Sequence, residues 1–138
     1  MGSNESISVY SEIGRLKSVL LHRPGEEVEN IVPDYLRKLL FDEIVFLEQA
    51  RREHDQFAGI LRNEGVEVCY LTELMTEVLK DQKVRDEFIM EFMMEGRAAT
   101  QGLQEAIMEF FSGLSPRELV AKCISGIQCE ELKDIKPR

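Results

Sequence analysis

Residues that bind metals or form disulfides are scarce in this 138-residue sequence, which has three cysteines, two histidines and no tryptophan. The cysteines, Cys69, Cys123 and Cys129, are an odd number and form no Cys-x-x-Cys pair. A disulfide framework needs paired cysteines and a zinc site needs closely spaced ligands, so neither is predicted. We expect reduced thiols, a cytoplasmic location, and no metal or other cofactor.

Long uncharged apolar stretches and clusters of basic residues are also missing. A membrane-spanning helix needs the first, and binding to a phosphate backbone needs the second. The N-terminal residues lack the basic start and apolar run of a secretory signal. A net charge of −9 would moreover repel nucleic acid. Neither a membrane nor a nucleic acid is therefore expected as a partner.

Recognisable catalytic motifs are a third absence. No Gly-rich phosphate loop, nucleophile elbow or metal-ligand spacing occurs along the chain. What is present is the composition of a globular domain, with 43% apolar and 31% charged residues and enough length for a core. The residues taken alone therefore predict a folded domain without an identifiable active site.

A strand, a long helix and a second strand are predicted in the first half. Residues 16–23 and 66–71 are short apolar runs rich in β-branched residues. Between them the spacing predicts a helix that begins at Asp42 as its N-cap and ends at Gly65. Its apolar stripe consists of Leu47, Ala50, His54, Phe57, Ala58 and Leu61. Two strands joined by one helix indicate a right-handed parallel crossover.

Three further expectations concern the segments around this unit. The alternation in 7–10 predicts a short edge strand, and 26–38 reads as an irregular connection with one helical turn at 35–39. Nearly continuous apolar character in 16–23 predicts a strand covered on both faces. A lone strand-helix-strand unit cannot supply that cover by itself, so the cover comes either from helices of the second half or, as we favour, from another part of a longer protein.

The second half changes character, because helical periodicity continues from Thr72 to Ile127. One helix is predicted to end at Gly96 and the next at Gly113. Ser115 is then followed by proline at the first helical position and by Glu118 three residues on, which is the pattern of a capping box. A last helix is predicted over 116–125, closed by Gly126, and the charged residues 130–138 resemble a linker.

Three groups of residues could have a functional role, but a structural role explains each of them more simply. His54 lies between two acids, but adjacent helical residues point about 100° apart, so a structural histidine is favoured over a catalytic one. Asp42 and Glu43 suit a helix N-terminus electrostatically. Met90, Met93 and Met94 could form a soft binding surface, although methionines on such helices more often fill a core.

An ordered set of segments closely resembles the N-terminal part of arginine deiminases. The matching segments lie at 14–25, 40–43, 53–57, 61–68 and 114–119. The resemblance implies an α/β fold, in which a partial first blade of a pentein α/β propeller is followed by an all-helical inserted domain. Its boundaries would be 1–71 for the blade, 72–128 for the helical insertion and 129–138 for a truncated linker.

The resemblance also implies a function, namely hydrolysis of L-arginine to L-citrulline and ammonia through a covalent intermediate on a cysteine. The family's catalytic cysteine, histidine and acids lie in later modules, and no position here matches them. Leu40 resembles a residue that lines the substrate entrance through its backbone, and Asp42 is its neighbour in the same motif. Glu43 replaces the family's commoner aspartate.

Two interpretations remain open. In the first, the chain is an N-terminal fragment of an arginine deiminase, inactive alone, which associates with the remainder of the same chain or with itself through exposed strands. L-arginine is then the substrate of the full-length enzyme. In the second, the chain is a stand-alone helical interaction module derived from a deiminase.

Overall fold

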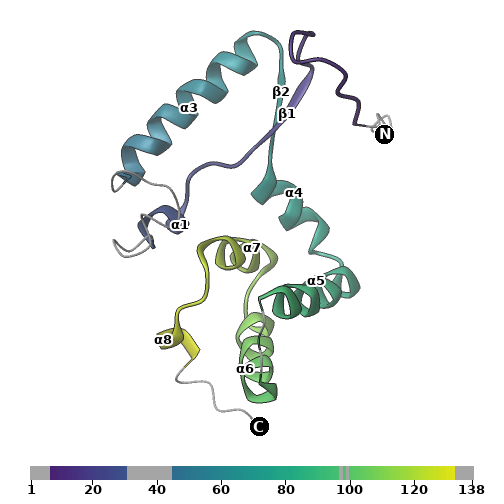
Figure 1. Ribbon diagram of the computed structural model, residues 1–138, viewed down its shortest axis with the longest axis vertical. Helices are drawn as coiled ribbons and strands as arrows, with labels where there is room; N and C mark the ends of the chain where they lie inside the picture. Colours follow the sequence, from purple (N-terminus) through teal and green to yellow (C-terminus); the bar gives the residue numbers. More distant parts are fainter. Residues whose placement is uncertain (1–6, 31–44, 97, 99, 133–138) are drawn as a thin grey trace.

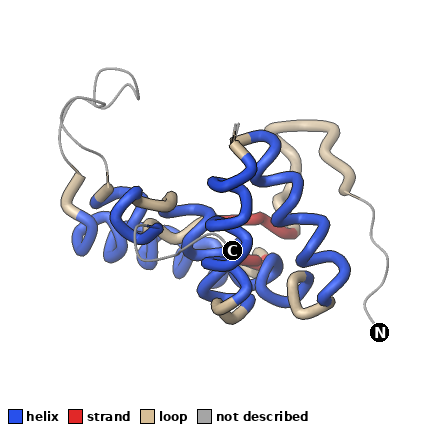
Figure 2. Tube along the Cα trace, turned by 90° about the horizontal axis from the view of Figure 1, so that it is seen from below, coloured by secondary structure: helices blue, strands red, loops and turns tan. Residues whose placement is uncertain are grey.

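The protein, seen here in a computed structural model that describes residues 7–30, 45–96, 98 and 100–132, has two differently built parts (Figure 1). The α/β part comprises β1 (Ser18–Leu21), α1 (Glu26–Glu29), α3 (Leu47–Asn63) and β2 (Glu67–Tyr70). The helical part comprises α4 (Leu71–Val78), α5 (Gln82–Glu95), α6 (Gln101–Ser112), α7 (Pro116–Ser125) and α8 (Cys129–Leu132). Helices dominate both, and the two short strands lie side by side (Figure 2).

The two strands pair in parallel, which confirms the predicted strand-helix-strand unit. Val19 pairs with Val68, and Leu21 pairs with Tyr70. Paired residues share a sheet face, and Tyr70 contacts side chains of α3, so this face is the one that α3 covers. The opposite face carries Leu20, which is 56% exposed. Within the described residues, cover on both faces is therefore not achieved.

Helix α3 begins later than its sequence predicts. Its N-cap is Phe46 in an extended conformation with no side-chain cap, so the helix starts at Leu47 and not at Asp42. Asp42 itself lies outside the described residues, as does the helical turn predicted at 35–39. The apolar stripe is largely confirmed, since Leu47 and Ala58 are buried, but Phe57 is 51% exposed. Phe57 was wrongly assigned to the covered stripe, because about half of its surface stays exposed in the described chain.

The end of α3 is confirmed, and it fixes the register of the strand that follows. Gly65 has φ +78°, a value that only glycine adopts without strain. Its N–H donates to Arg62 O at 3.0 Å, and the N–H of Val66 donates to Leu61 O at 3.0 Å. These two bonds form a Schellman motif, which satisfies the last carbonyls of the helix. The chain is thereby turned directly into β2.

Two other segments differ from expectation in the first half. Residues 7–10 form no strand, and Ile7, Val9 and Tyr10 are at least 82% exposed. The alternating pattern finds no partner strand among the described residues, which explains the difference. Residues 26–29, predicted as irregular, form the single-turn helix α1.

The helical part holds the main core of the described chain. Asp81 is the N-cap of helix α5, and its carboxylate accepts from Lys83 N at 2.9 Å and from Val84 N at 3.2 Å. Helices α5 and α6 end at Gly96 and Gly113, as predicted. The core cluster consists of Leu79, Ile89, Met93, Ala98, Ile107, Phe111, Leu119 and Val120. No helix in the described ranges is both long and apolar enough to span a membrane.

Helix α7 is confirmed in both bounds and in its cap. The N–H of Ser115 donates to Glu118 Oε2 at 2.7 Å, and the N–H of Glu118 donates to Ser115 Oγ at 3.4 Å. These reciprocal bonds are the capping box. Beyond Gly126 the segment predicted as a linker begins with α8, and its Leu132 packs against the core.

Contacts between the two parts involve α1, α4 and α7. Helix α4 begins directly at the end of β2 and packs on α7. The side chain of Asn30, after α1, donates to Ser125 O at 2.9 Å and accepts from Gln128 Nε2 at 3.3 Å. The segment that follows β1 therefore lies against the helical part, and it holds a cluster of polar contacts.

Candidate site at the end of strand β1

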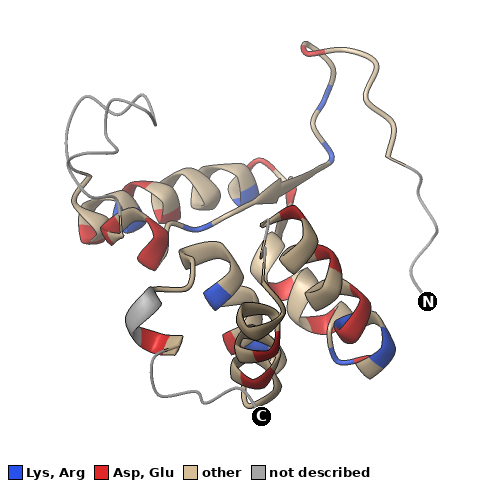
Figure 3. Cartoon of the chain, turned by 60° about the horizontal axis from the view of Figure 1, so that its bottom comes forward, with Lys and Arg blue, Asp and Glu red and all other residues tan. Residues whose placement is uncertain are grey.

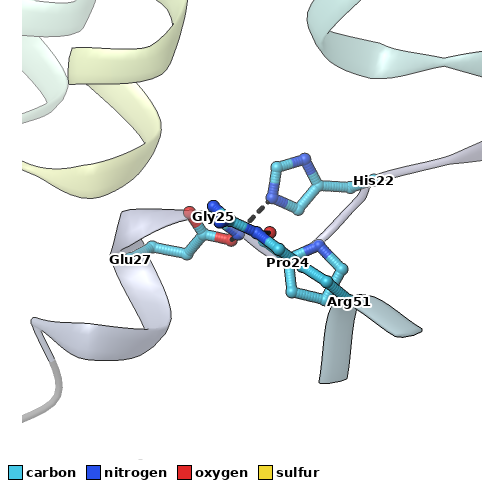
Figure 4. Close-up of polar contacts among 5 residues, drawn as sticks. All are labelled: His22, Pro24, Gly25, Glu27 and Arg51. Carbon is cyan, nitrogen blue, oxygen red and sulfur yellow. Dashed lines mark hydrogen bonds and ion pairs between the residues drawn. The ribbon is translucent and has the colours of Figure 1, made fainter. Parts of the chain in front are cut away.

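The carboxyl end of β1 is the place where a parallel sheet would present functional side chains. The strand ends at Leu21 and is followed by His22, Arg23, Pro24 and Gly25 before α1 begins. The sequence predicts that this strand delivers these residues to a loop, and the structure confirms it. Figure 4 shows His22, Pro24 and Gly25 beside Glu27 of α1 and Arg51 of α3.

Glu27 is the centre of this cluster. Its Oε1 lies 2.8 Å from His22 Nε2 and accepts from the N–H of Gly25 at 2.6 Å (Figure 4). Since an ionised carboxylate can only accept, the His22 ring donates through Nε2. Burial of Glu27 opposes its ionisation most strongly, but the bonds from Gly25 and His22 together outweigh it and lower the pKa of Glu27. Glu27 is therefore held as a carboxylate.

Gly25 is required by this close approach. A Cβ built on Gly25 would lie 2.5 Å from Glu27 Oε2. A side chain at position 25 would therefore require the Glu27 carboxylate to shift from this position. Glycine therefore leaves room for the carboxylate. Its φ of −123° is a value that other residues also adopt.

Two arginine contacts attach the loop to α3. Arg51 Nε donates to Pro24 O at 2.9 Å. Arg23 donates through Nε and Nη2 to the two oxygens of Asp55, each at 2.8 Å. This bidentate hydrogen bonding lowers the pKa of Asp55 and raises that of Arg23. Both side chains are about half exposed, so the pair orients the loop more than it stabilises the fold.

The chemistry that this cluster offers is limited. His22 and Glu27 form a hydrogen-bonded acid-base pair, and the buried Nδ1 of His22 has no hydrogen-bond partner among the described residues. No group of three potential metal ligands occurs in the described residues. The cluster can orient a loop and hold one histidine tautomer, which is a positioning role.

His54 lies outside this cluster, and the two acids that flank it form hydrogen bonds with other residues. Glu53 accepts from Gln49 at 2.8 Å, and Asp55 binds Arg23. The half-buried His54 ring packs instead against Tyr70, with centroids 5.8 Å apart. Its contacts match the structural interpretation that the sequence favours.

The cysteines show no sign of an activated nucleophile where they are described. Burial raises the pKa of the Cys123 thiol to about 11, so almost none of it is thiolate near neutral pH. Cys69 lies half-buried in β2 and is free, as is Cys123. The side chain of Cys129 lies outside the description.

The residues singled out as substrate contacts from sequence, Leu40 and Asp42, fall in 31–44 and lie outside the described residues. The structure therefore does not test them. Sequence reasoning missed Glu27, although one signal was available: a glutamate two residues after Pro-Gly can reach back to the N–H of the glycine. It also missed the pairing of Arg23 with Asp55, because 32 positions separate the two.

Comparisons with known proteins agree on one family. A model described as arginine deiminase matches residues 37–138. The chain is similar to arginine deiminase of Streptococcus sanguinis, with 51% identity over 134 residues, 96% of this chain and 33% of the relative. For arginine deiminase of Streptococcus uberis the identity is 50% over 136 residues, 98% of this chain and 33% of the relative.

These matches share one feature, namely that the chain spans about a third of the length of the curated relatives it matches. Within that third the similarity is nearly continuous, which extends the resemblance seen in separate segments of the sequence. On this evidence the chain belongs to the arginine deiminase family.

Proposed function

We propose that this chain forms the N-terminal part of an arginine deiminase, an enzyme that hydrolyses L-arginine to L-citrulline and ammonia. The observation that carries the proposal is about 50% identity to arginine deiminases over at least 96% of the chain. In the whole protein L-arginine is the substrate and no metal is needed. Free thiols at Cys69 and Cys123 agree with a cytoplasmic location.

The proposed architecture assigns 1–71 to part of the first blade of a pentein propeller, 72–128 to a helical insertion and 129–138 to a connecting segment. Two observations support it. Helix α4 begins at Leu71 immediately after β2, so the chain changes from strand to helix without a loop. The face of β1 that carries Leu20 is open, as expected of a sheet that further strands or helices would cover.

The chain alone is proposed to be inactive. Hydrolysis through an amidino-thioether needs a thiolate, a histidine that transfers protons, and carboxylates that hold the guanidinium. Burial raises the pKa of Cys123 to about 11, which opposes that role. We assign substrate contacts to Leu40, through its backbone, and to Asp42. Glu27, His22 and Gly25 hold the loop after β1, which precedes Leu40 and Asp42 in the sequence.

The test is reconstitution with the rest of a full-length arginine deiminase, expressed separately. The 138-residue chain alone should release no citrulline from arginine between about pH 5 and pH 9. Mixing it with the remainder should restore turnover, because the apolar face of β1 would then be covered. Citrulline release by the isolated chain that is lost with Cys69→Ser or Cys123→Ser would overturn the proposal.

Leu40 offers a sharper test in the reconstituted enzyme. If Leu40 acts through its backbone, Leu40→Ala should retain arginine binding, whereas Leu40→Pro should raise KM because proline removes the N–H and fixes φ. Equal kinetics for both variants would remove Leu40 from the site. Failure to reconstitute, with both pieces folded by circular dichroism, would instead favour a stand-alone interaction module.

A further inference from the structure

A groove of about 870 Å³ lies between α5 and α6. Methionines line it from both helices: Met90 and Met93 on α5, and Met108 on α6. Met93 is 8% exposed and belongs to the core, while Met90 and Met108 are 56% and 38% exposed. The groove therefore has a fixed base and two accessible apolar side chains.

Exposed methionines on both walls make this an adaptable apolar surface. Methionine is unbranched and polarisable, so it can repack around differently shaped partners. A groove between two helices is also the shape that accepts the apolar face of a third helix. Helix α6 has 12 residues, so at 1.5 Å per residue the groove is about 18 Å long, or roughly three helical turns.

The polar lining of the groove has one sign of charge. Glu105 and Glu109, one turn apart on α6, line it, and no lysine or arginine is among its described lining residues. The two basic side chains of α5 are already engaged: Arg85 donates to the carbonyls of Phe111 and Leu114, and Lys83 lies 3.9 Å from Glu87. Figure 3 shows the same excess of acidic positions along the helices.

We propose that this groove, defined by Met90, Met93, Met108, Glu105 and Glu109, binds a basic amphipathic helix of another protein. Its apolar side chains would pack on the methionines, and its lysines or arginines would face the two glutamates. A second copy of this chain is the poorer occupant, because two such acidic walls would repel each other and each chain carries a net charge of −9.

The first experiment measures binding of a fluorescent 14-residue helical peptide made of leucine and lysine to the 138-residue chain. Met90→Gln with Met108→Gln should weaken binding by about tenfold, since both apolar anchors are lost. The matched control is Met94→Gln with Leu103→Gln, whose side chains are 67% and 40% exposed but do not line the groove. It should stay within about twofold of the parent.

The second experiment separates a specific site from attraction to an acidic protein. Glu105→Gln with Glu109→Gln should weaken binding several-fold at low salt, whereas Glu12→Gln with Glu64→Gln, which changes the net charge equally, should not. Equal effects of the two pairs, or equal binding of a leucine-glutamate peptide, would overturn the proposal. So would a dimer in sedimentation that only Met90→Gln with Met108→Gln dissociates, because the occupant would then be a second copy.

Discussion

The helical part and the α/β part bury their apolar residues to very different extents. In the helical part Phe111, Leu79 and Leu119 are at most 1% exposed and belong to one cluster. In the α/β part Ala58 is fully buried, yet Leu20, Phe57 and Ile60 are all more than half exposed. The helical part therefore contains a cluster of large, fully buried side chains, whereas the largest apolar side chains of β1 and α3 remain partly exposed.

Chain topology explains this difference. The core of the helical part joins helices that are neighbours in sequence, so its contacts form with little loss of chain entropy. The sheet has two strands, and a sheet of that size needs cover or more strands for stability of its own. The comparison teaches that one chain can combine a self-sufficient unit with one whose stability depends on residues elsewhere.

The largest expected effect comes from removing the central aromatic side chain of the helical core. Phe111→Ala should lower the free energy of unfolding by about 3–5 kcal/mol, because the cavity cannot be refilled. Phe57→Ala is the matched change in the α/β part and should cost less than about 1 kcal/mol, since Phe57 is 51% exposed. Urea unfolding measures both, and equal losses would contradict the division into two unlike parts.

The next largest effect concerns a buried arginine. Arg85 is 9% exposed and its Nη2 donates to Phe111 O at 2.8 Å and to Leu114 O at 2.6 Å, which caps the end of α6. Arg85→Met should cost about 2 kcal/mol, because two carbonyls lose their donor. Arg52→Met on α3, which removes an exposed pair with Glu48, should cost about 0.5 kcal/mol or less. Thermal melts that rank the two in reverse would refute the capping role.

A smaller effect is expected at the start of α7. Ser115→Ala should cost about 1 kcal/mol, since the N–H of Glu118 loses its acceptor. Ser112→Ala removes a hydroxyl that bonds only within α6, to Glu109 O at 2.8 Å, and should change stability by less than about 0.5 kcal/mol. An unchanged melting temperature for Ser115→Ala would mean that the capping box does not support the helix in solution.

The smallest effect should come from the α/β part. Glu27→Gln replaces the carboxylate that accepts from Gly25 and His22, and should cost about 0.5 kcal/mol at neutral pH. Because the pKa of Glu27 is lowered by folding, its contribution is present above its ordinary value of 4.5 and is lost as the pH falls through the lower folded pKa. The difference between parent and variant should therefore vanish in acid.

Glu29→Gln is the matched control for that titration. Glu29 lies in the same helix and is exposed, so its replacement should have little effect at either pH. A difference for Glu27→Gln that persists unchanged in strong acid, where the carboxylate is protonated in the folded protein as well, would show that its charge does not stabilise the loop.

Local patterns allowed much of the fold to be predicted. The start of α7 and its capping box follow from four consecutive residues beginning at Ser115, its end follows from Gly126, and the turn at Gly65 follows from one glycine after an amphipathic run. Such signals depend on hydrogen bonds between residues at most five positions apart, so the sequence contains all of their parts. The start of α3 was misplaced because Asp42 has a good capping side chain, whereas the helix begins at Leu47 without one.

The sequence by itself determined helices α5, α6 and α7, the paired strands and the family. Only the tertiary structure decided that Phe57 stays exposed, that Arg85 is buried, that Glu27 joins His22 to Gly25 and that two methionine-bearing walls face each other. The physical reason is the separation in sequence between the residues that interact. A cap or a turn is settled by near neighbours, while burial and polar partners depend on which distant surfaces the folded chain brings together.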